Sequence, residues 1–255
     1  MGEYNAGLGR NWYDGLEVKL NKRVTGPTGR GLSYQLSYTW SKTINGDGYE
    51  NGWPYQDPFQ EHWIAGSDRT HVFSLTGVYD LPVGRGRQLL AGAARPMNAV
   101  IGNWTVSGVF NAESGTPVGL NTGWWHTCNQ SFRSPQGTSV GQGHWLNQDL
   151  SCWQGIPTYG LMNLFGTDSK LRNPTIPSLD VSVQKEVPLH ENLSLQLRLD
   201  AFNAMNSVLF GGPDSNPGDG PPSFSPTSGW SGFGTVGPTQ QNFPRMLQLS
   251  GKIAF

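Results

Sequence analysis

The sequence predicts an all-β fold: an antiparallel up-and-down meander that is a fragment of a transmembrane β-barrel with long loops on one side. Three observations predict it. Apolar and polar residues alternate in seven short segments, the connections between these segments vary in length in a regular order, and aromatic residues lie on the apolar faces. Alternation gives a strand one apolar and one polar face. Loop lengths and aromatic placement then favour a membrane barrel.

The composition disfavours helices and nucleic-acid binding. The chain has 35 Gly and 18 Pro, and only 14% of its residues are charged. No run of about 18 apolar residues exists, which excludes a transmembrane helix, whereas a barrel strand needs only about ten residues with every second one apolar. A formal net charge of -1 gives no broad attraction for polyanions. We therefore expect no nucleic-acid partner.

The alternation is clearest in residues 32–42. Leu36, Tyr38 and Trp40 share one face there, while Ser37 and Thr39 lie on the other. The seven alternating segments are 16–21, 32–42, 73–81, 104–113, 179–184, 193–200 and 247–255. In a water-soluble sandwich the polar face would meet solvent, so alternation alone does not say which side is wet.

The connections between these strands differ in length in a regular order. They run short, long, intermediate, long, short and long, over residues 25–31, 43–70, 82–103, 115–177, 188–192 and 203–244. Each long connection follows an even strand, so in a meander all three leave from the same edge. Short turns on one side and large loops on the other are typical of outer-membrane barrels. The predicted location is the bacterial outer membrane, with its lipid as the partner of the apolar faces.

A series of motifs resembles a known family. The segments Trp12–Arg23, Ser37–Lys42, Ser67–Phe73 and Arg198–Asn206, in this order, are similar to the barrel of TonB-dependent-receptor-like proteins of the Oar type, abundant in acidobacteria. The resemblance implies that residues 1–255 are a single barrel region, the C-terminal part of a barrel of about 22 strands. It also implies that the remaining strands, the plug and the N-terminal domains lie upstream. The absence of a signal peptide at the start agrees with that expectation.

The resemblance implies outer-membrane uptake or binding of a ligand, and the long loops are rich in candidate contact residues. Loops on a rigid scaffold often carry binding residues. The candidate ligand-binding residues are Trp53, Tyr55, Trp63, Trp124, Trp125, His126, Trp145 and Trp153. Exposed rings beside amide side chains suit a carbohydrate or another amphipathic ligand. In the alternative interpretation, these rings pack on one another and order the loop.

The two cysteines, Cys128 and Cys152, lie 24 residues apart in the same Trp-rich segment. Their spacing does not match a Cys-x-x-Cys site, and we predict a disulfide formed in an oxidising compartment. Two free thiols are the alternative. The carboxylates beside His62 lack a regular calcium-ligand series, and no nucleotide or zinc motif occurs. No cofactor and no metal are therefore expected.

Two further functions remain as alternatives. One is a secreted all-β carbohydrate-binding module. The other is a serine ester hydrolase, because Gly137–Gly141 matches G-x-S-x-G around Ser139, with Asp168 and His190 downstream. That motif must join a strand to a helix, whereas Ser139 lies in a segment rich in Gly and Gln. We therefore expect that the protein is not an enzyme.

Overall fold

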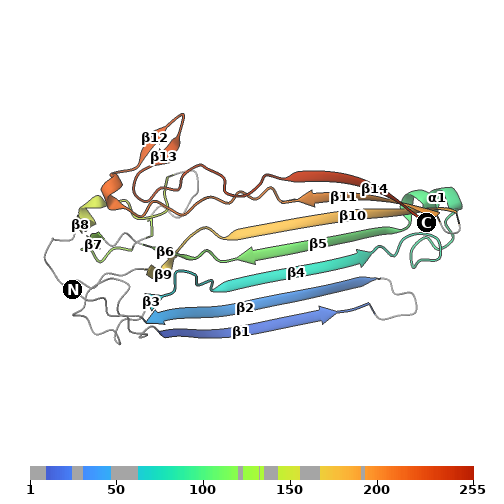
Figure 1. Cartoon of the computed structure of the whole chain (residues 1–255), viewed down its shortest axis with the longest axis horizontal. Coiled ribbons are helices and arrows are strands. Elements are labelled where there is room, and N and C mark those ends of the chain that lie inside the picture. The colour runs from blue at the N-terminus through green and yellow to red at the C-terminus, as the bar shows by residue number, and fades with distance from the viewer. Residues whose placement is uncertain are drawn as a thin grey trace, which may run out of the picture.

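The computed structural model describes residues 10–24, 31–46, 63–119, 123–131, 133–134, 143–155, 167–190 and 193–255. Its main element is one antiparallel sheet whose strands run along the length of the molecule (Figure 1). The long strands are β1 (Arg10–Lys22), β2 (Leu32–Gly46), β4 (His71–Asp80), β5 (Trp104–Glu113), β10 (Ile176–His190), β11 (Leu193–Phe202) and β14 (Met246–Ala254).

The order of these strands across the sheet is their order in the chain, β1-β2-β4-β5-β10-β11-β14, and every neighbouring pair is antiparallel. The predicted all-β meander is confirmed. The chain therefore crosses the sheet seven times and turns at alternating edges. The strand ends form two opposite borders of the sheet. We call the border from which the three long connections leave the loop edge, and the opposite border the turn edge (Figure 1).

The smaller elements lie mostly in the long connections. They are β3 (Trp63–Ile64), β6 (Pro117–Gly119), β7 (Trp124–His126), η1 (Leu150–Cys152), β8 (Trp153–Gly155), β9 (Thr167–Arg172), η2 (Pro217–Asp219), β12 (Ser223–Ser225) and β13 (Gly229–Ser231). Strand β3 pairs with β2, and the other six short strands form three two-stranded sheets, β6-β9, β7-β8 and β12-β13. In the described part of the chain, no helix has the length and apolar character needed to cross a membrane.

The register places all apolar rows on one face of the sheet. One row crosses six strands and consists of Leu32, Tyr79, Val106, Val183, Leu199 and Leu249, each directly opposite the next. A polar row on the other face consists of Lys19, Ser37, Ser74, Asn111 and Ser178. A slip of one residue in any pair would exchange the two faces of a strand. The alternation therefore specifies this register.

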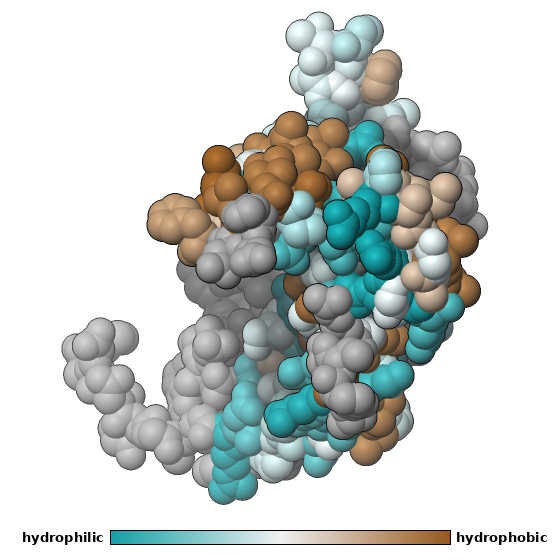
Figure 2. Space-filling model, turned by 90° about the vertical axis from the view of Figure 1, so that its right-hand side faces the viewer, coloured by the Kyte–Doolittle hydropathy of each residue, from teal (hydrophilic) through white to brown (hydrophobic). Residues whose placement is uncertain are grey.

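The apolar face has no protein layer over it among the described residues. Leu249, at the end of the six-residue row, is 77% exposed. Every buried hydrophobic residue of the described chain lies instead in one of the long connections at the loop edge. Figure 2 views the molecule from the turn edge and shows hydrophobic residues gathered along its upper and right-hand margins. The alternative of a secreted module would need a layer over this face, and the described residues do not supply one.

Two details of the turn edge differ from the prediction. Strand β10 continues through Pro188 to His190, where we expected a connection, and a bulge after Pro188 shifts the register. Proline lacks the N–H that the ladder uses, so a bulge accommodates it. The connection 82–103 contains a short helix, α1 (Arg95–Ile101), which the composition did not predict. Pro96 lies in its first turn, where the missing N–H has no cost.

Candidate functional site

The described residues of the connections 114–175 and 203–245 fold together into a cap at the loop edge (Figure 1). The cap has its own hydrophobic core, which consists of Val118, Trp145, Leu146, Cys152, Trp153, Leu171, Phe233 and Val236. The ring of Trp153 meets Phe233 edge-on at 5.2 Å between centroids. The indole N–H of Trp145 donates to the carbonyl of Arg172 at 3.0 Å. Two connections far apart in sequence are thus packed into one body.

The structure joins Cys128 and Cys152 in a disulfide, with a Cα–Cα distance of 5.2 Å. The bridge lies beside the β7-β8 pair, in which His126 is opposite Trp153. The amide of Thr127 donates to the carbonyl of Cys152 at 2.8 Å. The covalent bond and the backbone pairing therefore close the same loop of the cap.

The predicted ligand residues fall into three groups. Trp53 and Tyr55 lie outside the described residues, and the backbone of Trp125, but not its side chain, is described. Trp145 and Trp153 are each 8% exposed and belong to the cap core. These two rings are packed inside the cap, and a buried indole has little surface left for a ligand.

Three other predicted residues keep part of their surface. Trp63 lies in β3, opposite Asn45 of β2. Trp124 packs against the cap core and is half-buried. His126 is also half-buried, and its ring meets that of Trp153 at 4.9 Å. Trp63 lies apart from the other two, so the described candidates do not form a single aromatic platform.

An exposed aromatic pair was not predicted. Phe224 of β12 lies directly opposite Trp230 of β13, with 5.3 Å between ring centroids, and Phe224 is 60% exposed. The hairpin that carries them projects from the cap (Figure 1). His144 lies 6.4 Å from the Trp230 ring. The signal in the sequence is an aromatic residue on each side of a Pro and Gly turn, the pattern of a hairpin. We call His144, Phe224 and Trp230 the hairpin trio.

A buried ion pair connects the cap to the connection between β2 and β4. The carboxylate of Asp68, which is 1% exposed, accepts a hydrogen bond from Arg172 at 2.6 Å and another from the amide of Thr43 at 2.6 Å. Arg172 also donates to the carbonyls of Asp68 and Gly115, each at 3.1 Å. The chain thus supplies several partners for both charges, as burial requires.

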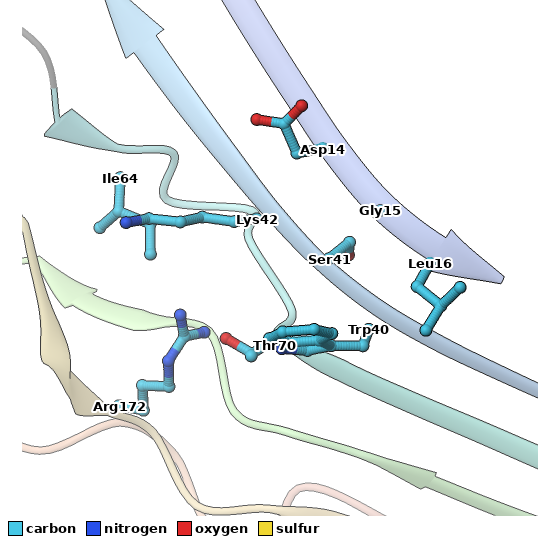
Figure 3. Close-up of a pocket in the computed structure, with 9 residues that line it drawn as sticks. All are labelled: Asp14, Gly15, Leu16, Trp40, Ser41, Lys42, Ile64, Thr70 and Arg172. Carbon is cyan, nitrogen blue, oxygen red and sulfur yellow. The ribbon is translucent and has the colours of Figure 1, made fainter.

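A pocket of about 490 Å³ lies beside this ion pair, where β1, β2, β3 and β9 meet. Figure 3 shows its lining, which consists of Asp14, Gly15, Leu16, Trp40, Ser41, Lys42, Ile64, Thr70 and Arg172. Leu16 and Trp40 are directly opposite each other on the apolar face. The pocket therefore lies on the side of the apolar face and not on the polar face.

A second, smaller groove of about 240 Å³ lies on the polar face. Its lining includes Gly77 and Gly108, which are directly opposite each other in the register. The side chain of Arg198 donates to Ser182 at 2.9 Å and to Asp200 at 2.8 Å. This part of the polar face therefore carries charged groups of both signs.

Burial and hydrogen bonding shift the pKa of three groups in the cap. Burial lowers the pKa of His126, and the nearby Asp149 opposes that change. Hydrogen bonds from the hydroxyl and the amide of Ser151 lower the pKa of Asp149. Burial raises the pKa of Asp214. Within the described residues, no three His, Cys, Asp or Glu side chains lie close enough to hold a metal ion.

Two of the three residues of the hydrolase alternative can be placed on the described backbone. Ser139 lies outside the described residues. Asp168 lies in β9 at the loop edge, whereas His190 ends β10 at the turn edge. The 15 residues of β10 separate these edges, a distance of roughly 45 Å at the rise of a strand. The backbone thus places Asp168 and His190 far apart, at opposite edges of the sheet.

Comparison with known proteins gives one match. A family model described as "Outer membrane beta barrel domain" matches residues 3–248. No curated protein and no solved structure matches the chain.

Proposed function

This chain belongs to the outer membrane β-barrel domain family and lies in the bacterial outer membrane, and within that family we propose that it is the C-terminal barrel portion of a TonB-dependent-receptor-like protein. In this proposal the cap captures an amphipathic ligand, such as a carbohydrate, from outside the cell. The polar face then lines the lumen through which the ligand passes.

The hairpin trio is the observation that carries the ligand-capture proposal. Phe224 holds an exposed ring against Trp230 at the end of a projecting hairpin. An exposed aromatic face gives apolar contact to a sugar ring, while His144 nearby offers a hydrogen-bonding group. Trp230 is kept in place because its ring packs on Gly143, where even a Cβ atom would clash. The pair is thus preorganised, which lowers the entropic cost of binding.

The two outer strands of the sheet support the proposal of a larger barrel. Strand β1 pairs only with β2, and β14 pairs only with β11, within the described chain. Every residue of β1 is exposed. The outer side of a strand carries backbone N–H and C=O groups, and in hydrocarbon these groups need hydrogen-bond partners. Strands from an upstream part of the barrel would pair with both edges, with a plug inside the lumen.

Oligosaccharide binding tests the ligand-capture proposal. The barrel that contains this chain, folded in a neutral detergent, would be titrated with a panel of soluble oligosaccharides while tryptophan fluorescence is recorded. We expect one of them to bind saturably, and Phe224→Ala and Trp230→Ala each to weaken that binding at least about ten-fold. Phe243→Ala is the matched control, because Phe243 is an exposed ring in the same connection but outside the trio.

Two results would count against the proposal. Either no oligosaccharide in the panel binds, or the two variants bind as tightly as the unaltered chain. Heat-modifiable migration on gels would show in each case that the variant barrel is folded.

A further inference from the structure

The connection between β4 and β5, residues 82–103, forms a compact structure at the turn edge that we call the foot. Its backbone is well hydrogen-bonded: Leu89 donates to Pro82 at 2.8 Å, and Gly84 to Leu89 at 2.9 Å. The side chain of Asn98 in α1 accepts from the amide of Arg85 at 2.6 Å. Gly84 has a φ of 121° and packs so closely on Asn98 that a Cβ atom would clash. The foot is thus a compact, hydrogen-bonded structure and not a simple turn.

The foot presents apolar side chains to the outside. Its exposed apolar residues are Leu89, Leu90, Met97 and Val100, of which Val100 is 70% exposed. Leu90 adopts a φ of 59°, a conformation that costs about 1 kcal/mol for a residue with a Cβ atom. The foot therefore exposes four large apolar side chains to its surroundings.

The foot lies on the lipid-facing side of the sheet and not on the lumen side. The indole N–H of Trp104, a residue of the apolar face, donates to the carbonyl of Val100 at 2.9 Å. Lys185 is on the same face, and its buried amine donates to the carbonyl of Gly102 and lies 5.2 Å from the centre of the Trp104 ring. The exposed apolar residues of the foot therefore continue the apolar face, and a plug inside the lumen would not reach them.

The charge of the foot has a single sign. Arg85, Arg87 and Arg95 lie in it, and no Asp or Glu occurs between Asp80 and Glu113. Arg85 and Arg95 are exposed, and within the described chain neither forms an ion pair. Cationic groups beside inserted apolar side chains are the pattern of an interfacial anchor for anionic lipid.

We propose that the foot is a binding site for anionic phospholipid in the leaflet at the turn edge, with Arg85 and Arg95 holding the phosphate headgroup and Leu89, Leu90 and Val100 contacting the acyl chains. Short turns of outer-membrane barrels face the periplasm, so this leaflet is the inner one. The site rests on the barrel's place in the membrane and not on ligand transport. It goes beyond the proposed function, which concerns the opposite edge.

Spin-label electron paramagnetic resonance tests the site. The barrel that contains this chain would be reconstituted into phosphatidylcholine vesicles that contain a trace of spin-labelled phosphatidylglycerol or phosphatidylcholine. The fraction of motionally restricted lipid would then be measured. We expect a preference of about three-fold for phosphatidylglycerol, which declines in high salt. In the double variant Arg85→Gln and Arg95→Gln the preference should fall to about one.

Arg245→Gln is the matched control, because Arg245 is exposed at the loop edge, and it should leave the preference unchanged. Heat-modifiable migration would show that each variant is folded. The proposal is overturned if the unaltered chain shows no preference, or if the double variant keeps it. Inorganic phosphate added at millimolar concentration should not abolish the preference, since loss at that concentration would indicate a simple anion site without acyl-chain contact. Loss of oligosaccharide binding at the cap would leave this result unaffected.

Discussion

Asp68 and Arg172 form a buried ion pair at 2.6 Å between residues that are 104 positions apart in the chain. Asp68 precedes β4, and Arg172 ends β9. The pair therefore attaches the cap to the sheet at one point of the loop edge, beside the pocket of about 490 Å³ that Arg172 also lines.

Removing one partner of this pair should loosen the attachment of the cap. Asp68→Ala leaves the Arg172 guanidinium buried without its carboxylate, which should destabilise the region by about 3 kcal/mol. The amide of Thr43 donates to Asp68, so its hydrogen exchange should accelerate. Arg69→Gln is the control, because Arg69 forms a more exposed pair with Glu113 and should change stability by less than about 1 kcal/mol. Equal effects of the two substitutions would contradict the role of the buried pair.

Loss of the disulfide should destabilise the cap and spare the sheet. The double variant Cys128→Ala and Cys152→Ala frees a loop closed across 24 residues, at a cost of about 3 kcal/mol. Mass-spectrometric hydrogen exchange should show faster exchange in β7 and β8 and unchanged exchange in β4 and β5. Uniform acceleration across both regions would show that the cap and the sheet unfold together.

Acid should destabilise the cap through His126. Burial lowers its pKa in the folded chain, so the folded state binds fewer protons than the unfolded state. The contribution to stability is therefore present above the unfolded pKa of about 6.5 and is lost as the pH falls through the folded pKa. Exchange of the Thr127 amide should accelerate as the pH is lowered from 7 to 5, after correction for the intrinsic rate. His126→Gln should remove this pH dependence.

Charge should be tolerated on one face of β14 and not on the other. Leu249→Arg places a charge on the apolar face, which should cost about 2 to 4 kcal/mol if the residue lies near the bilayer centre. Gln248→Arg is its neighbour on the polar face, opposite Asp200, and should be tolerated. The folded fraction recovered from outer membranes, assayed by heat-modifiable migration, should fall for Leu249→Arg only. A loss for both variants would show that the two faces are not distinguished.

The sheet could be predicted from the sequence because its determinants are local and periodic. Leu32 and Tyr34 reveal the face of their strand without knowledge of any partner, and the order of loop lengths then gives the common edge. Strand ends were less certain, since β2 continues to Gly46 by pairing with β1 and β3. That extension depends on contacts and not on alternation.

The cap and the foot could be predicted only in part, because nonlocal packing decides them. Burial of Trp145 and Trp153 depends on Phe233 and Val236, which belong to a different connection. The link between Asp68 and Arg172 likewise has no periodic signal. Helix α1 has only seven residues, and isolated helices this short are unstable in water. Its formation therefore depends on the contacts that Trp104 and Lys185 make with this part of the foot.

The separation of the buried hydrophobic residues from the strands affects how the protein can evolve. Substitutions within the cap meet the demands of a small protein core, whereas substitutions in the strands meet only the preference of each face for lipid or water. The sequence of the cap can therefore change without a compensating change in the strands of the membrane scaffold. Packing thus constrains substitutions in the cap, and the polarity of each face constrains substitutions in the strands.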